Sequence, residues 1–406
     1  MLSVLLVSTL VPAQAVQAKS RPVVPMELFG VHYHDIINTA PNFRVGAVRL
    51  WDSGVTWARL NPAQGVYEWD ALDRAVDNAR NAGALEVQYV FGVAPQWAAA
   101  KPTMNGFYGP GSNSPPATMA YFTDFARAMA ERYRGRITSY EIWNEGSLKV
   151  FFGGTSKQLA DLTIKGARAI KSVDPGAKVL SASSTYGVFT RRPKFWKDYA
   201  LRLKKARWPI DAVNIHPYSK TPDYLSKREK TISKARSFYR KYGFKGPIWD
   251  TEVNYGDRRG MFSGFKQISY SGDVAAGMVA RTYVDAMRLG VPRVFWYGWD
   301  YHLFGIDMID PGTKVQTEAG VAFHTVQDWM VGKRWYGCTT KKYVRSCKLR
   351  GPDGARTTIV YATSKTRSYK IPAGVGTFQN LRGEVLGVVP GQRITVNAVP
   401  VLIQGA

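Results

Sequence analysis

Two glutamates, Glu145 and Glu252, each stand near the end of a short apolar run, and together they have the residue types that break a glycosidic bond. The runs, at residues 137–145 and 247–254, are rich in β-branched and aromatic residues, which is typical of strands. Cleavage of such a bond needs one carboxyl group that protonates the leaving oxygen and a second that attacks the anomeric carbon or activates water. Because the carboxyl groups do the chemistry themselves, we expect no cofactor and no metal ion.

The two runs belong to a longer alternation of strands and helices. Amphipathic stretches lie between the apolar runs, and in residues 70–82 the apolar residues recur at helical spacing. Eight alternations over about 300 residues predict a (β/α)8 barrel, an α/β fold. A doubly wound sheet would instead need a glycine-rich phosphate loop after its first strand, where residues 32–35 read His-Tyr-His-Asp. The strand candidates are residues 29–34, 47–52, 86–91, 137–145, 178–183, 212–218, 247–254 and 293–300.

In a (β/α)8 barrel, function sits at the C-terminal ends of the strands, and nearly every candidate strand here ends in polar or aromatic residues. We predict that these residues bind the substrate. For the first-strand histidines and the tryptophans, packing inside the protein is an equally good explanation. Glu141 and Asp250 lie earlier on the two glutamate strands, where a structural role is favoured. The predicted substrate-binding residues are His32, His34, Arg49, Trp97, Asn144, His216, Tyr218, Trp296 and Trp299.

Three motifs resemble glycoside hydrolases of clan A, and in chain order they are Glu141-Ile-Trp-Asn-Glu145, Asn214-Ile-His-Pro-Tyr218 and Trp249-Asp-Thr-Glu252. Residues 57–73 and 95–97 strengthen the resemblance, which covers residues 29–330 and is strongest to family 39 and related bacterial exopolysaccharide hydrolases. It implies a retaining mechanism with Glu145 as acid/base and Glu252 as nucleophile. Family members commonly have proline after the fourth-strand glutamate, whereas Gly146 follows it here.

A retaining mechanism places physical demands on the residues around the two glutamates. Their carboxyl groups must lie about 5–5.5 Å apart, and the acid/base must have a raised pKa, which a neighbouring carboxylate provides. We expect Asn144 to hydrogen-bond the sugar hydroxyl beside the reacting carbon. Arg49 is expected to keep the nucleophile ionised, with a buried structural ion pair as the alternative. His216 and Tyr218 are expected to orient the glutamates by hydrogen bonds.

The two ends of the chain differ from the barrel region. Residues 1–18 are largely apolar and end in small-x-small patterns, which predicts a signal peptide, with an uncleaved apolar anchor as the alternative. Residues 19–334 form the predicted barrel. In residues 335–406 short runs alternate with glycine and proline turns, which predicts a small antiparallel β domain that caps the barrel or binds polymer. The only two cysteines, Cys338 and Cys347, are predicted to form one local disulfide in an exported protein.

The chain is strongly basic, with a formal net charge of +25 and a sequence pI near 9.9. Such a balance favours anionic partners, but no nucleic-acid-binding module pattern is present. We therefore predict a secreted or cell-envelope protein that acts on a polysaccharide or oligosaccharide, neutral or anionic. We expect no nucleic-acid partner and no stable membrane insertion after the signal peptide is removed.

Two other classes of function remain open. His32, His34, His216 and Asp300 echo the ligands of a metal-dependent amidohydrolase barrel, but such a barrel also needs a fourth-strand lysine and a fifth-strand histidine. Metal analysis of the purified protein separates this class from a glycosidase. A non-catalytic polysaccharide-binding barrel is the second alternative, and it would deplete a ligand without producing new reducing ends.

Overall fold

The computed structural model describes residues 21–185, 192–219, 224–261 and 265–405. The predicted signal peptide, residues 1–18, lies outside the described residues. Within them, no helix combines the length and apolar character needed to cross a membrane.

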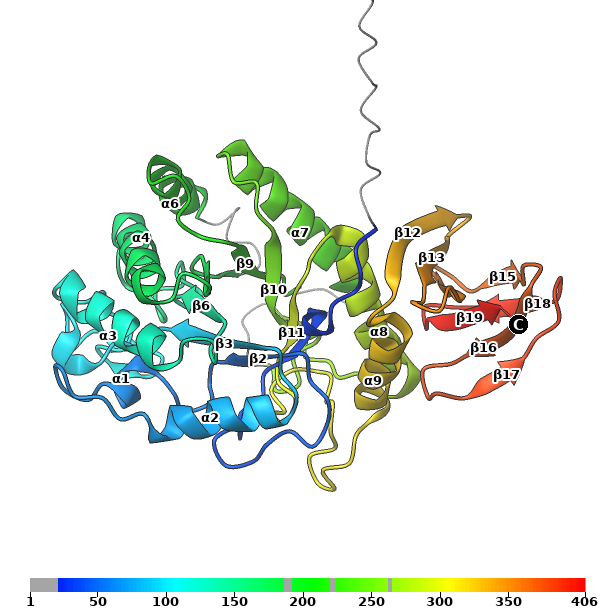
Figure 1. Cartoon of the computed structure of the whole chain (residues 1–406), viewed down its shortest axis with the longest axis horizontal. Coiled ribbons are helices and arrows are strands. Elements are labelled where there is room, and N and C mark those ends of the chain that lie inside the picture. Colours follow the sequence, from blue (N-terminus) through cyan, green and yellow to red (C-terminus); the bar gives the residue numbers. More distant parts are fainter. Residues whose placement is uncertain (1–20, 186–191, 220–223, 262–264, 406) are drawn as a thin grey trace, which may run out of the picture.

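A parallel sheet forms the centre of the larger part of the molecule (Figure 1). In their order across the sheet, its nine described strands are β7 (Lys178–Leu180), β6 (Ser139–Ile142), β3 (Glu86–Phe91), β2 (Ala47–Leu50), β1 (Phe29–Val31), β11 (Val294–Trp296), β10 (Ile248–Val253), β9 (Val213–His216) and β8 (Ser184–Thr185). All of their pairings are parallel.

The two outermost strands are β7, which lies within the predicted strand at residues 178–183, and β8, which follows that strand directly, and together they close the sheet into a barrel. Leu180 in β7 forms a parallel bridge with Ala212, which directly precedes β9. The Asp211 amide also donates a hydrogen bond to the Val179 carbonyl at 2.7 Å. The fifth barrel strand, β7, therefore contacts the sixth, β9, as a closed barrel requires. The predicted (β/α)8 barrel is confirmed.

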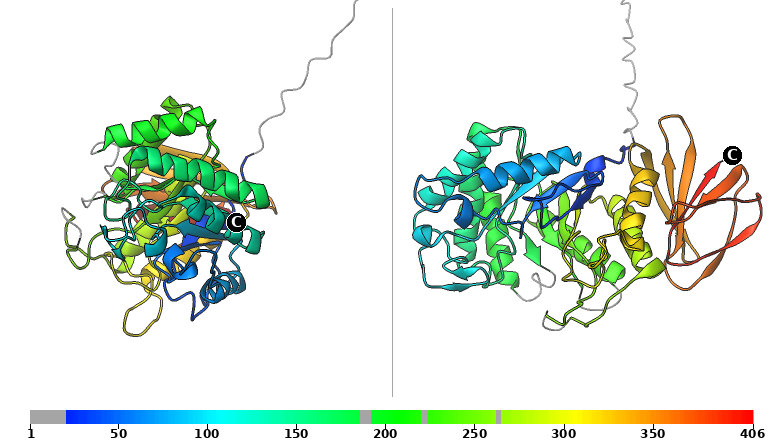
Figure 2. Two further views of the ribbon diagram at one scale, coloured as in Figure 1. Left: turned by 90° about the vertical axis from the view of Figure 1, so that its left-hand side faces the viewer. Right: turned by 90° about the horizontal axis from the view of Figure 1, so that it is seen from below.

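Helices surround the barrel strands (Figures 1 and 2). They are α1 (Trp57–Leu60), α2 (Asp70–Asn81), α3 (Met119–Arg132), α4 (Ser156–Val173), α6 (Pro193–Lys205), α7 (Tyr224–Lys241), α8 (Gly272–Leu289) and α9 (Glu318–Met330), with short 3-10 turns η1 (Met26–Leu28) and η2 (Gln96–Ala98). In α2 the predicted apolar stripe is the buried face, made of Ala71, Leu72, Ala75, Val76 and Ala79. A capping box between Thr155 and Gln158 begins α4.

A small apolar layer fills the barrel beneath its functional end. Its members come from widely separated strands and pack against one another in the barrel interior; they are Ala47, Leu180, Ala212, Trp249 and Phe295. Strand residues alternate in direction, so on β2 the next inward position after Ala47 is Arg49. The polar side chains described below therefore sit directly on an apolar floor.

Strand β10 has one extra residue, which redirects its last side chains. Asp250 is opposite Val294 on β11, but Val253 is opposite Trp296, so three steps on β10 match two on β11. Asp250 points outward, where it accepts a hydrogen bond of 2.7 Å from Arg228 on α7. Because a bulge shifts the alternation by one residue, both positions between Asp250 and Val253 are available to the barrel interior. This irregularity is what turns Glu252 inward.

The C-terminal part is an antiparallel β structure that lies beside α8 and α9 (Figure 1). Its strands are β12 (Arg334–Lys341), β13 (Val344–Arg350), β14 (Arg356–Ala362), β15 (Arg367–Lys370), β16 (Val375–Gln379), β17 (Val385–Gly387), β18 (Arg393–Val396) and β19 (Val401–Gly405). Six form a sheet in the order β12-β13-β14-β19-β16-β17, while β15 pairs with β18. The antiparallel β structure agrees with the prediction. The domain boundary between residues 334 and 335 stays a prediction.

Buried polar contacts attach this β structure to the barrel. Asp285 on α8 accepts hydrogen bonds from Arg345 at 2.9 Å and from the Tyr361 hydroxyl at 2.8 Å. On α9, the Trp329 indole donates to Gln379 at 2.8 Å. The predicted disulfide between Cys338 and Cys347 is present, and it joins β12 to β13.

Candidate active site

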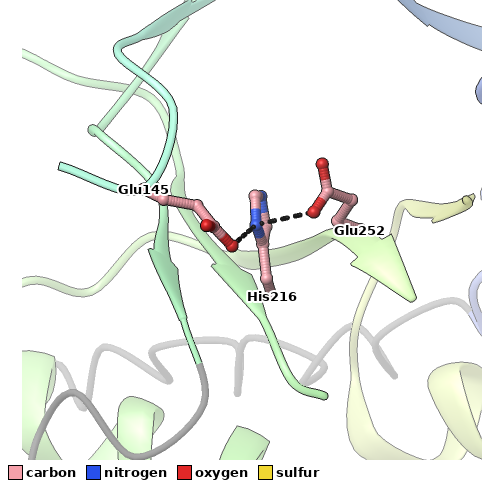
Figure 3. A group of neighbouring side chains, drawn as sticks. All are labelled: Glu145, His216 and Glu252. Atoms are coloured by element: carbon pink, nitrogen blue, oxygen red, sulfur yellow. Dashed lines mark hydrogen bonds and ion pairs between the residues drawn. The ribbon is translucent and has the colours of Figure 1, made fainter. Parts of the chain in front are cut away.

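Glu145, His216 and Glu252 meet at the C-terminal end of the barrel strands (Figure 3). Glu145 lies three residues beyond β6, His216 is the last residue of β9, and Glu252 lies near the end of β10. The Nδ1 atom of His216 is 2.9 Å from Glu145 Oε1 and 3.1 Å from Glu252 Oε2. Nδ1 and one oxygen of each carboxylate all lie within 4.8 Å of one another. Two carboxylates far apart in sequence thus face each other across one imidazole.

The backbone around Glu145 is held in an unusual conformation. Trp143 and Glu145 have positive φ values of 85° and 45°, a region that costs a residue with a side chain about 1 kcal/mol or more. The Glu145 amide donates a hydrogen bond to Ser183 Oγ at 2.8 Å, which helps to hold the turn. A Cβ atom at Gly146 would come within 2.5 Å of the Leu159 side chain, so a larger residue after the glutamate would require Leu159 to move.

Arg49 connects both glutamate strands from within the barrel. Its guanidinium is fully buried and donates to Glu252 Oε1 at 3.0 Å and to Asn144 Oδ1 at 2.8 Å. It also forms a two-pronged ion pair with Glu141, at 2.8 and 2.9 Å, and the Gln88 amide donates to the same carboxylate. One arginine therefore serves both as a structural ion pair and as a direct partner of Glu252.

The environment drives the pKa values of the two glutamates apart. Burial raises the pKa of the Glu145 carboxyl, and the negative charge of Glu252 adds to this, against the hydrogen bond from His216. Burial also acts to raise the pKa of Glu252, but the charges of His216 and Arg49 outweigh it and hold that pKa well below its ordinary value. Burial likewise opposes a charge on His216, yet the carboxylates raise its pKa to about 9. At neutral pH the site thus favours an ionised Glu252 beside a Glu145 that keeps its proton longer than an ordinary glutamate.

Tyr218 and His32 complete the surroundings of Glu252. The Tyr218 hydroxyl donates to Glu252 Oε2 at 3.2 Å. His32 is fully buried, and its Nε2 lies 3.0 Å from the Thr251 carbonyl and 3.3 Å from Arg49 Nη1. Burial and the charge of Arg49 lower the pKa of His32 well below its ordinary value, so this histidine is neutral. It supports the strand end from beneath.

The structure does not bring the predicted tryptophans to the glutamates. Trp296 is fully buried and points away from the barrel interior, with its ring against Tyr255. Trp299 stacks on Phe43 at 3.9 Å between ring centroids, close to α9. The indole of Trp97 donates to the Asn61 carbonyl. The positions of these three side chains agree with packing inside the protein, the alternative to substrate binding.

His34 lies at the rim. Its amide donates to Asp300 Oδ1 at 2.7 Å, and its ring contacts Tyr297 and Tyr301. The amidohydrolase ligand set is therefore not assembled, since Asp300 binds the backbone of the first strand end while His216 lies between the glutamates. Among the described residues, the one group of acidic, histidine or cysteine side chains close enough to hold a metal ion is Glu145, His216 and Glu252.

A hydrogen-bonded trio near Glu252 was not recognised as a unit in the sequence. Asp52 accepts hydrogen bonds from Tyr108 and, at 2.8 Å, from Tyr297, and burial raises the pKa of Asp52. Tyr108 stands in the hairpin of β4 (Asn105–Gly106) and β5 (Gly109–Pro110), next to Phe107, which is 65% exposed. In the sequence, the pair of aromatic residues Phe107 and Tyr108 between two glycines was the only local sign of this group. With Phe151, these rings form an aromatic platform beside the site.

The site and fold together define a (β/α)8 barrel with a facing carboxylate pair at its C-terminal mouth. No protein-family model matches the chain, and no curated protein matches it either. Solved structures do match. A family 39 glycoside hydrolase from Bacteroides cellulosilyticus WH2 superposes with a TM-score of 0.69 at 17% identity, over 94% of this chain and 81% of that one.

Two further solved structures show the same fold. A family 39 β-xylosidase from Caulobacter crescentus matches with a TM-score of 0.63 at 15% identity, over 95% of this chain and 98% of that one. A conserved exported protein from Bacteroides fragilis matches with a TM-score of 0.68 at 12% identity, over the same shares of the two chains. The resemblance to clan A glycoside hydrolases, family 39 in particular, is therefore confirmed at the level of the fold.

Proposed function

We propose that this protein is a retaining glycoside hydrolase that cleaves a polysaccharide outside the cytoplasm. Glu252 attacks the anomeric carbon, and Glu145 protonates the leaving oxygen and then activates the water that releases the product. The observation that carries the proposal is the pair of facing carboxylates. One oxygen of each lies within 4.8 Å of the other, and the two pKa values are driven in opposite directions. This separation suits a nucleophile better than it suits a water molecule held between two carboxyl groups.

The other polar side chains have roles that follow from their contacts. Arg49 and the His216 imidazolium hold Glu252 ionised, and Tyr218 orients it. Asn144 uses its carbonyl oxygen to accept from Arg49, which orients its amide nitrogen as a donor for a sugar hydroxyl. His32 supports the strand end, and the platform of Phe107, Tyr108 and Phe151 offers faces on which sugar rings stack.

Export is part of the proposal. The apolar segment at residues 1–18, the Cys338–Cys347 disulfide and the match to an exported protein all support it. The net charge of +25 favours an anionic polymer as substrate.

The first test is a panel of cell-envelope, plant and bacterial polysaccharides, neutral and anionic, assayed for new reducing ends. Once a substrate is found, NMR of the first product should show the same anomeric configuration as the substrate. An inverted product would contradict the assignment of Glu252 as nucleophile. Loss of polymer from solution without new reducing ends would instead support a binding protein, and activity that depends on a bound metal would support the amidohydrolase class.

Replacing Glu145 by Gln should reduce activity in a way that depends on the leaving group. On the polysaccharide, whose leaving oxygen needs a proton, we expect kcat to fall roughly 10²- to 10⁴-fold. On an aryl glycoside of the same sugar with a nitrophenolate leaving group, bond cleavage needs no proton, so the rate of glycosyl-enzyme formation should fall far less. Pre-steady-state kinetics measures that step. An equal loss on both substrates would contradict the acid/base role.

Replacing His216 by Asn should move the pH profile of kcat/KM to higher pH. The acidic limb reports ionisation of Glu252, and His216 lowers that pKa, so its removal moves this limb upward. The basic limb reports loss of the Glu145 proton, and His216 lowers that pKa too, so this limb also moves upward. A profile that keeps its position, or moves downward, would show that His216 does not tune the pair.

A further inference from the structure

The first three strands of the C-terminal sheet place three arginines side by side. Arg334 on β12 is directly opposite Arg350 on β13, and Arg350 is directly opposite Arg356 on β14. All three are exposed, whereas the next residues along the strands, such as Trp335 and Leu349, are buried on the other face. The arginines therefore share one face of the sheet in a single row across it.

The middle of the outer face is covered, whereas the arginine end is not. Further along the outer face, Val360 and Ala362 are buried against Ile371 and Val396, which belong to the β15–β18 layer. The opposite face packs on the barrel through Tyr361. The exposed end of the outer face is thus open to a partner.

Further cations lie on or beside this row, and one exposed aromatic ring stands two residues after Arg334 on β12. Lys348 is exposed and stands two residues before Arg350 on the same face. Arg21 places its guanidinium 5.6 Å from the ring centroid of Tyr336, which is 41% exposed. We call the set the arginine face; it consists of Arg21, Arg334, Tyr336, Lys348, Arg350 and Arg356.

The cations of the arginine face have no close acidic partners. Within the described part of the chain, none of the five forms an ion pair with an aspartate or glutamate, although Asp353 stands in the turn between Arg350 and Arg356. The hydrogen bonds of Arg334 and Arg350 go to backbone carbonyls. Like charges directly opposite on neighbouring strands destabilise a sheet. An anion bound across the row would relieve that repulsion, and guanidinium groups bind oxyanions in a two-pronged geometry.

We propose that the arginine face binds an anionic polysaccharide and so holds the polymer to the enzyme away from the catalytic carboxylates. The inference rests on the proposed function for its choice of polymer. The Cys338–Cys347 disulfide in the same pair of strands indicates an oxidising compartment outside the cytosol, and the Tyr336 ring adds a surface on which a sugar stacks. Both features favour a polysaccharide over a nucleic acid.

The test measures binding without hydrolysis, in the Glu145→Gln background. The row variant carries Arg334→Gln, Arg350→Gln and Arg356→Gln. The matched control removes three exposed cations from α6 by Lys197→Gln, Arg202→Gln and Lys205→Gln, so both variants lose the same charge. Native gels cast with polygalacturonate, or with neutral dextran, report the affinity of each protein for the polymer.

We expect polygalacturonate, but not dextran, to retard the Glu145→Gln parent. The row variant should bind polygalacturonate about tenfold more weakly, because several charge-assisted contacts are lost together, and the control should change by less than about threefold. The row variant should melt at the same or a higher temperature than its parent, since the substitutions remove repulsion.

Several results would overturn the inference. One is that polygalacturonate does not retard the parent. Another is that the row and control variants lose affinity for polygalacturonate equally. A third is that the row variant melts at a lower temperature than its parent. A double-stranded DNA fragment that displaces polygalacturonate at a lower concentration of charged groups would assign the face to nucleic acid instead. The proposed hydrolysis is tested separately from binding. If it fails, the unsubstituted protein releases no new reducing ends from any polysaccharide of the panel.

Discussion

Replacing Glu252 by Gln should abolish polysaccharide hydrolysis, with kcat reduced roughly 10⁴-fold or more. An amide cannot form the glycosyl-enzyme bond, and no second carboxylate can substitute from the same strand. Asp250 is committed to Arg228 on the outer side of β10. Unlike the Glu145 variant, this one should also fail on aryl glycosides with good leaving groups, because attack by the nucleophile and departure of the leaving group are the same step. Initial rates of reducing-end release and of nitrophenolate release check both expectations.

The matched control is Glu131→Gln, which removes an exposed glutamate of α3 and should leave the rates unchanged. Thermal unfolding should show that the Glu252 variant is folded, since glutamine has nearly the same shape and keeps one oxygen that can accept from Arg49. A folded Glu252→Gln protein with normal activity would remove the nucleophile role, and with it the proposed mechanism.

Replacing Arg49 by Met should damage both the fold and the chemistry. The substitution leaves the fully buried Glu141 without its ionic partner, which costs about 3–5 kcal/mol of unfolding free energy. It also removes one of the charges that lower the pKa of Glu252, so that pKa rises and the acidic limb of kcat/KM moves to higher pH. Denaturant unfolding and pH profiles measure the two effects. Arg49→Lys, which keeps the charge but loses the two-pronged geometry, gives a milder variant if the methionine protein does not fold.

Arg228 provides the control for this experiment. It is also buried, and it pairs with a strand carboxylate, Asp250, but on the outer side of the barrel. Arg228→Met should therefore lose stability to a similar extent while the pH profile of the remaining folded enzyme keeps its position. If both arginine variants, or neither, shifted the acidic limb, Arg49 would be only a structural residue.

Most of the barrel was predictable because local patterns agree with it. The apolar stripe of α2 occupies the buried positions that helical spacing requires, and the strand runs lie where β1, β2, β3, β6, β9, β10 and β11 form. The separate short strand β8, directly after the predicted strand at residues 178–183, was not predictable. It depends on the pairing of Leu180 with Ala212 across the point of barrel closure, which is a long-range contact.

The tryptophans show where strand-end reasoning stops. Parallel strands are covered on both faces, so their sequences are apolar throughout and do not reveal which residues point inward. Phe295 points into the barrel, whereas its neighbour Trp296, which was predicted to bind substrate, points out. Tyr108 was missed for a related reason, since its hairpin returns to Asp52 through a fold that no local pattern encodes.

The sequence by itself determined the fold class, the pair Glu145 and Glu252, and the residue types that surround them, because chain order and alternation place strand ends at one rim. Tertiary structure alone decided how those residues are aimed. The extra residue in β10 turns Glu252 inward while Asp250 faces Arg228, and Arg49 reaches across from β2. Register, bulges and shared ion pairs arise between strands distant in the chain, so only the assembled barrel defines them.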